Sequence, residues 1–281
     1  MRASILINNY NYGLYLNECL KSCLNNRVKN LEIIVYDDKS TDNSISILKQ
    51  FKNKIIVVEN NFSKSIHNSE NQLNAIKRAL DLSKGEIVFL LDSDDYFKKD
   101  KIKTVLEIYE KRPEIEAVHD SMIFLDNNKM LKQKYISSFS DISIDDFVKF
   151  SGYIYSLGPQ TSALSFKRTY LYDLINRYNK DLNLIWPDLQ LGRKSILEKK
   201  GIVLKDYLTV RRIHKSSDSQ KLKSVQFSNQ VKKQLVLFYG INSNRKNSFK
   251  SLLLAIIYSI KKSNFFLMFF LIKSNLNKLI R

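Results

Sequence analysis

Short β-branched segments alternate with longer segments of helical periodicity over the first 110 residues. The β-branched segments are Ser4–Ile7, Leu31–Tyr36, Lys54–Val58 and Glu86–Leu91. In the segments between them apolar residues recur three and four positions apart, as at Leu16, Cys19, Leu20 and Cys23. This alternation predicts an α/β protein in which helices cover both faces of a mostly parallel sheet.

Polar residues come directly after three of these predicted strands. They are Asn8-Asn9-Tyr10-Asn11, Asp37-Asp38 and Asp92-Ser93-Asp94-Asp95. Ligands of open α/β sheets bind beyond the carboxyl ends of the strands. We therefore expect these three groups to converge on one crevice.

The acidic group that begins at Asp92 has two interpretations. Carboxylates crowded after a buried strand repel one another unless a cation or hydrogen-bond donors compensate. Mg²⁺-like ions take such oxygen ligands together with substrate phosphates, which favours a metal–diphosphate site. The alternative is a helix N-cap cluster, because Asp is favoured before a first helical turn.

The second half of the chain is less regular. Its predicted elements are a strand over Ala117–Leu125, helices over Lys167–Arg177 and Asp188–Lys199, and one or two strands over Ile202–Ile213. We expect a catalytic domain over residues 1–218, with halves at 1–112 and 113–218, and a helical extension over 219–281. The N-terminal apolar segment is too short for a signal peptide and is interpreted as a buried strand of a cytoplasmic protein.

The positive charge is concentrated at the C-terminus. The net charge is +18, yet residues 205–281 hold 16 Lys and Arg against two acidic residues, which leaves +4 for the rest. A nucleic-acid-binding protein would spread its basic residues along a groove. Residues 245–281 combine Lys with apolar helical spacing in stretches too short to span a bilayer. They predict an amphipathic surface for an anionic membrane, or else helices that pack on the domain or a partner.

Composition excludes several other classes. Seven Gly and three Pro are too few for a linker-rich or low-complexity chain, and two Cys are too few for a disulfide scaffold. Cys19 and Cys23 lie on an apolar helical stripe without further zinc ligands, so we predict that they pack in the core.

Two blocks of the sequence resemble the family 2 glycosyltransferases of the GT-A fold. The first runs from Ser4-Ile5-Leu6-Ile7-Asn8-Asn9-Tyr10-Asn11 through Tyr15–Leu20 to Glu32–Ser44, and the second is Gly85–Asp95. The resemblance covers about residues 1–110. It implies a GT-A fold, with a nucleotide-binding, mostly parallel sheet flanked by helices, followed here by the C-terminal helical extension.

The resemblance also implies roles for individual residues. Asn9, Tyr10 and Asn11 would line the nucleotide pocket, Asp38 would contact the base, and Asp92 would lie near the ribose. Asn74 and Ser93 belong to the same nucleotide-sugar set. Asp94 would bind the divalent metal, with Asp95 as support. The chain departs from the family where Asn8-Asn9 replaces Pro-Thr or Pro-Ser, and where Leu73-Asn74 replaces Arg-Asn.

The second half carries a thinner resemblance. Trp186-Pro187-Asp188 is similar to the family segment that supplies the catalytic base, and Asp188 would take the proton of the acceptor hydroxyl. Its alternative role is a helix N-cap. Trp186 would form an acceptor-binding wall, or else a packed aromatic contact. His214, after Arg211-Arg212-Ile213, would bind the metal or a phosphate, or else be a surface histidine.

The resulting hypothesis is an inverting glycosyltransferase. It would move a sugar from a nucleotide-diphosphate sugar, most favourably a UDP-sugar, to a glycan or lipid-linked acceptor at the inner face of the cell membrane, with Mn²⁺ or Mg²⁺ as cofactor. One alternative is a sugar nucleotidyltransferase, which would need a Gly-rich loop where Asn8–Asn11 stands. The others are a basic nucleic-acid-binding protein and a non-catalytic, glycan-binding member of the family.

Overall fold

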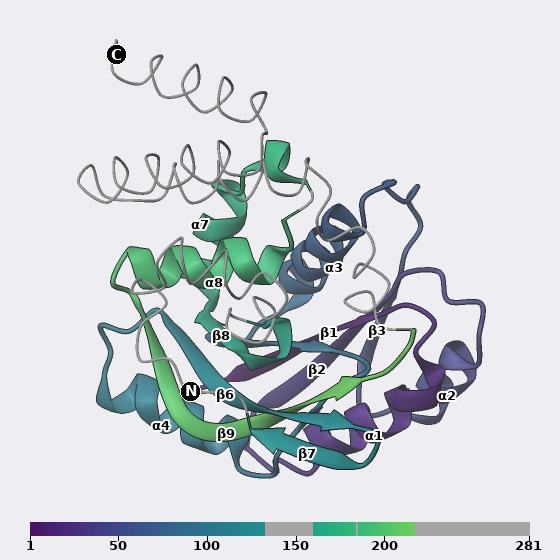
Figure 1. The fold of residues 1–281 in the computed structure, drawn as a ribbon, viewed down its shortest axis with the longest axis horizontal. Coiled ribbons are helices and arrows are strands. Elements are labelled where there is room, and N and C mark those ends of the chain that lie inside the picture. The colour runs from purple at the N-terminus through teal and green to yellow at the C-terminus, as the bar shows by residue number, and fades with distance from the viewer. Residues whose placement is uncertain (133–159, 184, 217–281) are drawn as a thin grey trace, which may run out of the picture.

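The computed structural model describes residues 1–132, 160–183 and 185–216, and its strands form one mixed sheet (Figure 1). The strand order is β3-β2-β1-β4-β8-β6-β9-β5, with β7 paired to β6. The α/β prediction is confirmed. The predicted extension over 219–281, including the proposed membrane segment 245–281, lies outside the described residues.

The N-terminal half of the sheet is parallel. It contains β1 (Ala3–Asn9), β2 (Leu31–Asp37), β3 (Ile56–Glu59) and β4 (Ile87–Asp92). Central β1 pairs with both β2 and β4, and its register sets Asn9 opposite Asp37 and Asn8 opposite Asp92. The polar groups that follow these strands therefore emerge at one edge of the sheet.

Helices cover both faces of the sheet. On one face lie α1 (Gly13–Leu24), α2 (Ser44–Gln50) and α4 (Lys101–Lys111), packed on side chains such as Ile5 and Val35. On the other lie α3 (Asn68–Leu82), α7 (Arg168–Asn176) and α8 (Pro187–Leu197), packed on Leu6 and Leu90. Adjacent residues of one strand thus point into different cores, as strand geometry requires. Cys19 and Cys23 are buried in the first core as free thiols, as predicted.

The second half extends the sheet and returns the chain to the acidic loop. It adds β5 (Tyr96–Phe97), β6 (Ala117–Asp126), β7 (Lys129–Lys132), β8 (Leu164–Lys167) and β9 (Gly201–Ile213), with short 3-10 helices η2 (Thr161–Ala163) and η3 (Lys180–Leu182). Long β9 runs parallel to β6, and its far end pairs antiparallel with β5. This pairing carries the residues after Thr209 to the loop that follows β4.

Within the part of the chain that the structure describes, no helix combines the length and the apolar character needed to cross a bilayer.

Candidate active site

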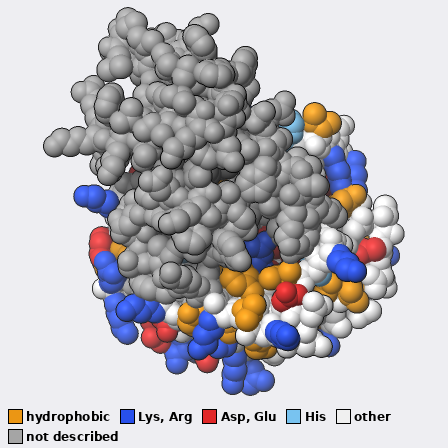
Figure 2. Space-filling view, in the orientation of Figure 1, with side chains coloured by type: hydrophobic (Ala, Val, Ile, Leu, Met, Phe, Trp, Pro, Cys, Tyr) orange, Lys and Arg blue, Asp and Glu red, His pale blue; other side chains and the backbone are white. Residues whose placement is uncertain are grey.

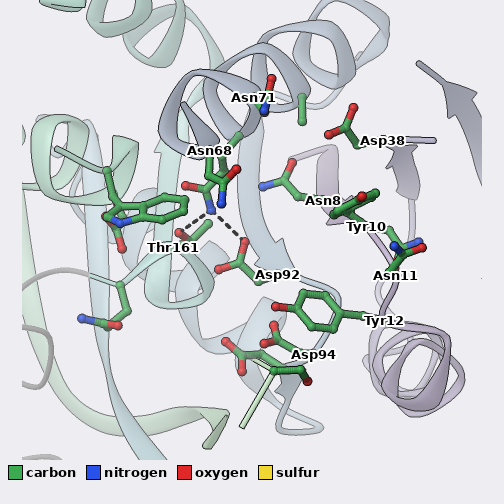
Figure 3. Close-up of a pocket in the computed structure, with 18 of the residues that line it drawn as sticks. Asn8, Tyr10, Asn11, Tyr12, Asp38, Asn68, Asn71, Asp92, Asp94 and Thr161 are labelled. Carbon is green, nitrogen blue, oxygen red and sulfur yellow. Dashed lines mark hydrogen bonds between the residues drawn. The ribbon is translucent and has the colours of Figure 1, made fainter. Parts of the chain in front are cut away.

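A cavity of about 590 Å³ lies beyond the carboxyl ends of β1, β2 and β4. The predicted site residues that line it are Asn9, Tyr10, Asn11, Asp38, Asp92, Asp94, Trp186 and Asp188. Figure 3 shows Asp92 and Asp94 on one side of the cavity and Asp38 on another, with Asn8 between Asp38 and Asp92 in this view. The structure therefore brings together strand ends and a helix start that are far apart in the sequence.

The acidic loop after β4 contains two carboxyl groups with raised pKa values, Asp92 and Asp95. Burial, together with the nearby charges of Asp94 and Asp188, raises the pKa of Asp92 to about 7. Burial and the Asp94 charge also raise the pKa of Asp95. Asp95 accepts hydrogen bonds from Ser162 Oγ at 2.7 Å and from the Arg212 backbone N–H at 3.0 Å. All three carboxylates line the cavity, and Asp95 also anchors the loop through these two hydrogen bonds.

Asp94 meets His214 across 120 residues of sequence. His214 Nε2 lies 3.0 Å from Asp94 Oδ2, and His214 Nδ1 lies 2.8 Å from Ser216 Oγ. The rings of Tyr12 and Tyr15 pack on the imidazole, with centroid distances of 5.5 and 4.6 Å. These contacts fix the ring plane, as outer-shell partners of a metal-binding histidine do.

The donor set at this pair fits a divalent ion that also binds a diphosphate. Among the described residues, no three His, Cys, Asp or Glu side chains lie close enough to hold a metal. Asp94 and His214 supply one oxygen and one nitrogen. Asp94 lines the cavity, whereas His214 is not among its lining residues and reaches it only through its contact with Asp94. Mg²⁺-type sites commonly take one or two protein carboxylates and complete their shell with water and substrate phosphates.

Asp38 is paired at the opposite end of the cavity. Asn60 Nδ2 donates to Asp38 Oδ1 at 2.5 Å, and Lys64 Nζ lies 3.2 Å from Asp38 Oδ2. The same ammonium sits 3.2 Å from the centroid of the Tyr10 ring. A planar base that used Asp38 and the exposed face of Tyr10 would have to displace Lys64.

Asn9 and Asn11 hold the loops of the cavity in place. Asn9 Nδ2 donates to Asp37 Oδ2 at 2.6 Å and to Ser40 Oγ at 3.2 Å. Asn11 adopts a left-handed backbone (φ 55°), and its side-chain oxygen accepts from the Thr41 N–H at 2.7 Å. Asn tolerates this region better than most residues, which explains its use at the turn.

Asp188 lies in the first turn of α8, directly after Pro187, and Trp186 is the N-cap residue. The Asp188 carboxyl is partly exposed to the cavity but surrounded by protein. Burial raises the pKa of Asp188 to about 6, although hydrogen bonds from Leu189 and Thr161 and the charge of Arg211 favour its ionised form. Asp188 therefore lies at the cavity with a raised pKa, which is what its predicted role as general base would require.

Two of the predicted nucleotide-sugar residues do not line the cavity. Asn74 is exposed on α3, whose cavity-facing residues are Asn68, Asn71, Gln72 and Ala75. Ser93 is fully buried, and its hydroxyl has no hydrogen-bond partner among the described residues.

Sequence reasoning missed Gln72 and Thr161. Gln72 Nε2 donates to Asp92 Oδ1 at 3.0 Å and to Thr161 Oγ1 at 3.1 Å, the dashed bonds of Figure 3. The helical phase of α3 could have revealed Gln72, since it lies four positions from both Asn68 and Ile76. Nothing in the sequence pattern marked Thr161.

The sequence of the chain is similar to those of known glycosyltransferases. The model of glycosyl transferase family 2 matches residues 4–200. A β-1,3-glucosyltransferase of Escherichia coli, named for UDP-Glc as donor and α-D-GlcNAc-diphosphoundecaprenol as acceptor, is 35% identical over 108 residues. That match is 38% of this chain and 41% of the relative. The first curated relatives are matched over 24% to 41% of their own lengths.

Solved structures share the fold. TarS of S. aureus, solved with UDP-GlcNAc, aligns over 99% of this chain and 92% of its own, with a TM-score of 0.60 and 16% identity. The mannosyltransferase PcManGT of Pyrobaculum calidifontis, solved with GDP-Man and Mn²⁺, aligns over 90% and 74%, with a TM-score of 0.55 and 16% identity. The likeness confirms the predicted GT-A fold.

Proposed function

The chain belongs to glycosyl transferase family 2, and we propose that it is an inverting enzyme that moves a sugar from a nucleotide-diphosphate sugar to a glycan hydroxyl. The observation that carries this proposal is the arrangement of Asp92, Asp94 and Asp188 around one cavity at the sheet edge. Asp188, whose pKa is raised to about 6, faces the same cavity as Asp94, which is a candidate ligand of a metal–diphosphate.

In the proposed reaction Asp188 acts as the general base. It accepts the proton of the acceptor hydroxyl while that oxygen attacks the anomeric carbon from the side opposite the diphosphate. The new bond joins the acceptor oxygen to the anomeric carbon. The bond from that carbon to the phosphate oxygen breaks, and the nucleoside diphosphate leaves with the electron pair. One displacement of this kind inverts the anomeric centre.

Asp94 and His214 would hold Mn²⁺ or Mg²⁺, and such an ion would stabilise the negative charge on the departing diphosphate. Arg211 also lines the cavity and bonds Gln160. Its guanidinium is well suited to a phosphate oxygen. Asp38 and Tyr10 would bind the base, and Trp186 would contact the acceptor.

We propose a UDP-sugar as donor and a glycan on a lipid carrier as acceptor. The printed names of the Escherichia coli relative and the TarS complex support a UDP-sugar, whereas the GDP-Man complex keeps other nucleotides open. The diphosphoundecaprenol acceptor of the Escherichia coli relative and the basic extension of this chain support a lipid-linked acceptor. The proposed location is the cytoplasmic face of the cell membrane, with residues 1–218 as the catalytic domain.

Family membership disfavours the sugar nucleotidyltransferase considered above. The nucleic-acid alternative also loses support, because the cavity is lined by carboxylates. In addition, on the described part of the face in Figure 2, Lys and Arg side chains are scattered around the rim and not gathered in one patch.

The test is thermal unfolding of the full chain with UDP, GDP, CMP or dTDP, each with and without Mn²⁺. A ligand at about 100 times its Kd should stabilise the fold by about 2.7 kcal/mol. We expect a Mn²⁺-dependent rise in Tm with UDP that is lost in Asp94→Asn and kept in Asp81→Asn, a variant at the far end of α3. The absence of any nucleotide-dependent rise would contradict the proposal.

A further inference from the structure

A buried ammonium group lies in the layer beneath the acidic loop. Lys101 is the first residue of α4, and its side chain has no solvent exposure. Lys101 Nζ donates to Asp120 Oδ1 at 2.5 Å, to the Ser162 carbonyl at 2.7 Å and to Thr209 Oγ1 at 2.6 Å. All three N–H bonds of the ammonium are used, and they tie together α4, β6, η2 and β9.

The buried ion pair of Lys101 and Asp120 is not expected to contribute much to the stability of the fold. Burial lowers the pKa of Lys101 and raises that of Asp120, so desolvation opposes both charges of the pair. Buried ion pairs often contribute no more than apolar residues of the same volume. We therefore look for the role of Lys101 in the segments that its hydrogen bonds hold in place.

One partner of Lys101 connects directly to the acidic loop. Ser162, whose carbonyl accepts from Lys101, donates through Oγ to Asp95 Oδ2 at 2.7 Å. The same hydroxyl accepts from the Asp92 backbone N–H at 3.1 Å. The carbonyl of Ser162 thus binds the ammonium, and its hydroxyl binds both ends of the loop that carries Asp94.

The other partner leads to the same loop from β9. Thr209 donates to Asp120 Oδ2 at 2.7 Å while it accepts from Lys101. Three residues further along β9, Arg212 donates its backbone N–H to Asp95 and its guanidinium to the Asp94 carbonyl at 2.6 Å. Beside Ser162 in η2, Thr161 hydrogen-bonds to Asp188. Three routes from one ammonium therefore end at the backbone of Asp92 and Asp94, at the Asp95 carboxylate and at Asp188.

We propose that Lys101 is a positioning residue for sugar transfer: through Ser162 and Thr209 it sets the geometry of the Asp92–Asp95 loop and of Asp188 without touching substrate. The inference rests on the proposed function of those carboxylates. Outer-shell partners of metal ligands typically change metal affinity or activity by about 10- to 100-fold when they are removed.

The test compares wild type with the double variant Lys101→Met/Asp120→Leu, which removes both charges and leaves no unpaired carboxylate. Three properties are measured on the full chain. The first is thermal unfolding, and the second is the affinity for Mn²⁺ in the presence of UDP, followed by the fluorescence of Trp186, the one tryptophan of the sequence. The third is the kcat and KM for hydrolysis of UDP-GlcNAc and UDP-Glc. We expect cooperative unfolding, a Mn²⁺ affinity about 10-fold lower and a kcat at least about 10-fold lower, with donor KM little changed.

A conservative pair keeps the test decisive if the double variant does not fold. Thr209→Val removes the hydroxyl at nearly constant volume, and Thr209→Ser retains it. We expect Val to lower kcat about 10-fold and Ser to restore it to within about twofold of wild type. Arg177→Met, which breaks a surface ion-pair cluster with Asp173 and Glu198, is the control and should keep the wild-type kcat.

The outcomes separate the two proposals. If wild type binds no Mn²⁺–UDP, the proposed function is wrong and the inference falls with it. If wild type binds and turns over the donor, and the folded Lys101 or Thr209→Val variants do so equally well, the positioning role alone is wrong.

Discussion

The Asp188 carboxyl is expected to set the pH dependence of sugar transfer. A general base must be ionised, and burial raises the pKa of Asp188 to about 6. We therefore predict that kcat falls as the pH drops through about 6. Asp188→Asn should lower kcat by about 10²- to 10⁴-fold with little change in donor KM. Steady-state rates between pH 5 and 9 measure both effects.

The residual activity of Asp188→Asn serves as the control for this assignment. It should lose the inflection near pH 6, because the titrating group is gone. An unchanged inflection in that variant would assign the pH dependence to another group and contradict the base role of Asp188.

Lys64 occupies the proposed base site, and we expect it to compete with the nucleotide there. Its ammonium pairs with Asp38 and covers the Tyr10 ring, and each contact is worth about 0.5–1 kcal/mol at a partly exposed position. Lys64→Ala should therefore strengthen UDP binding by about fivefold, measured by calorimetry. Lys77→Ala, at an exposed position of α3, is the matched control. Weaker UDP binding in Lys64→Ala would indicate that Lys64 contacts the nucleotide instead.

The turn before β4 packs closely against the backbone at the start of β1. A Cβ added at Gly85 would lie 2.5 Å from the Ser4 backbone N and 2.7 Å from the Ala3 carbonyl carbon. Because backbone atoms cannot move aside cheaply, Gly85→Ala should lower the free energy of unfolding by about 1–3 kcal/mol. Urea denaturation measures the change.

Gly13→Ala is the comparison for this prediction. A Cβ at Gly13, the first residue of α1, would meet mainly the side chain of Asn43, which can rotate. Ala is also favoured over Gly in a helix by about 1 kcal/mol. Equal urea midpoints for the two variants would show that the close approach of Gly85 does not limit packing.

The whole chain is expected to bind anionic membranes through its C-terminal charge. Residues after Asp218 contain no acidic side chain, and each Lys or Arg near a negative surface contributes about 1 kcal/mol. The full chain should therefore bind vesicles that contain phosphatidylglycerol, and binding should weaken as NaCl is raised. Co-sedimentation with phosphatidylglycerol and with phosphatidylcholine vesicles measures it.

Lys261→Gln/Lys262→Gln should weaken vesicle binding by at least about 10-fold, by the same charge arithmetic. Lys77→Gln/Lys103→Gln, at exposed positions of α3 and α4, removes equal charge from the catalytic domain and should have a smaller effect. Equal binding to neutral vesicles would contradict an electrostatic membrane contact and favour packing of the extension on protein.

Local patterns in the sequence were sufficient for the fold class and for much of the cavity. Strand–helix alternation predicted the parallel sheet because burial repeats every two residues in a strand and every 3.6 in a helix. Parallel pairing then brought Asn9, Asp38 and Asp92 to one edge, since strands in the same direction end on the same side. The resemblance to the family assigned roles to Asp94 and Asp188, and both residues line the same cavity.

Tertiary structure alone decided which partners these residues meet. His214 reaches Asp94, and Thr209 reaches Lys101, because β9 pairs with β5 beside the acidic loop, while η2 brings Ser162 to the same lysine. No local periodicity encodes a contact between residues 61 to 120 positions apart. The phase of α3 likewise turns Gln72 into the cavity and Asn74 to solvent. The sequence determined at which edge of the sheet the polar groups gather, because parallel strands end on the same side. Long-range packing determined which of these groups are buried and which partners they bind.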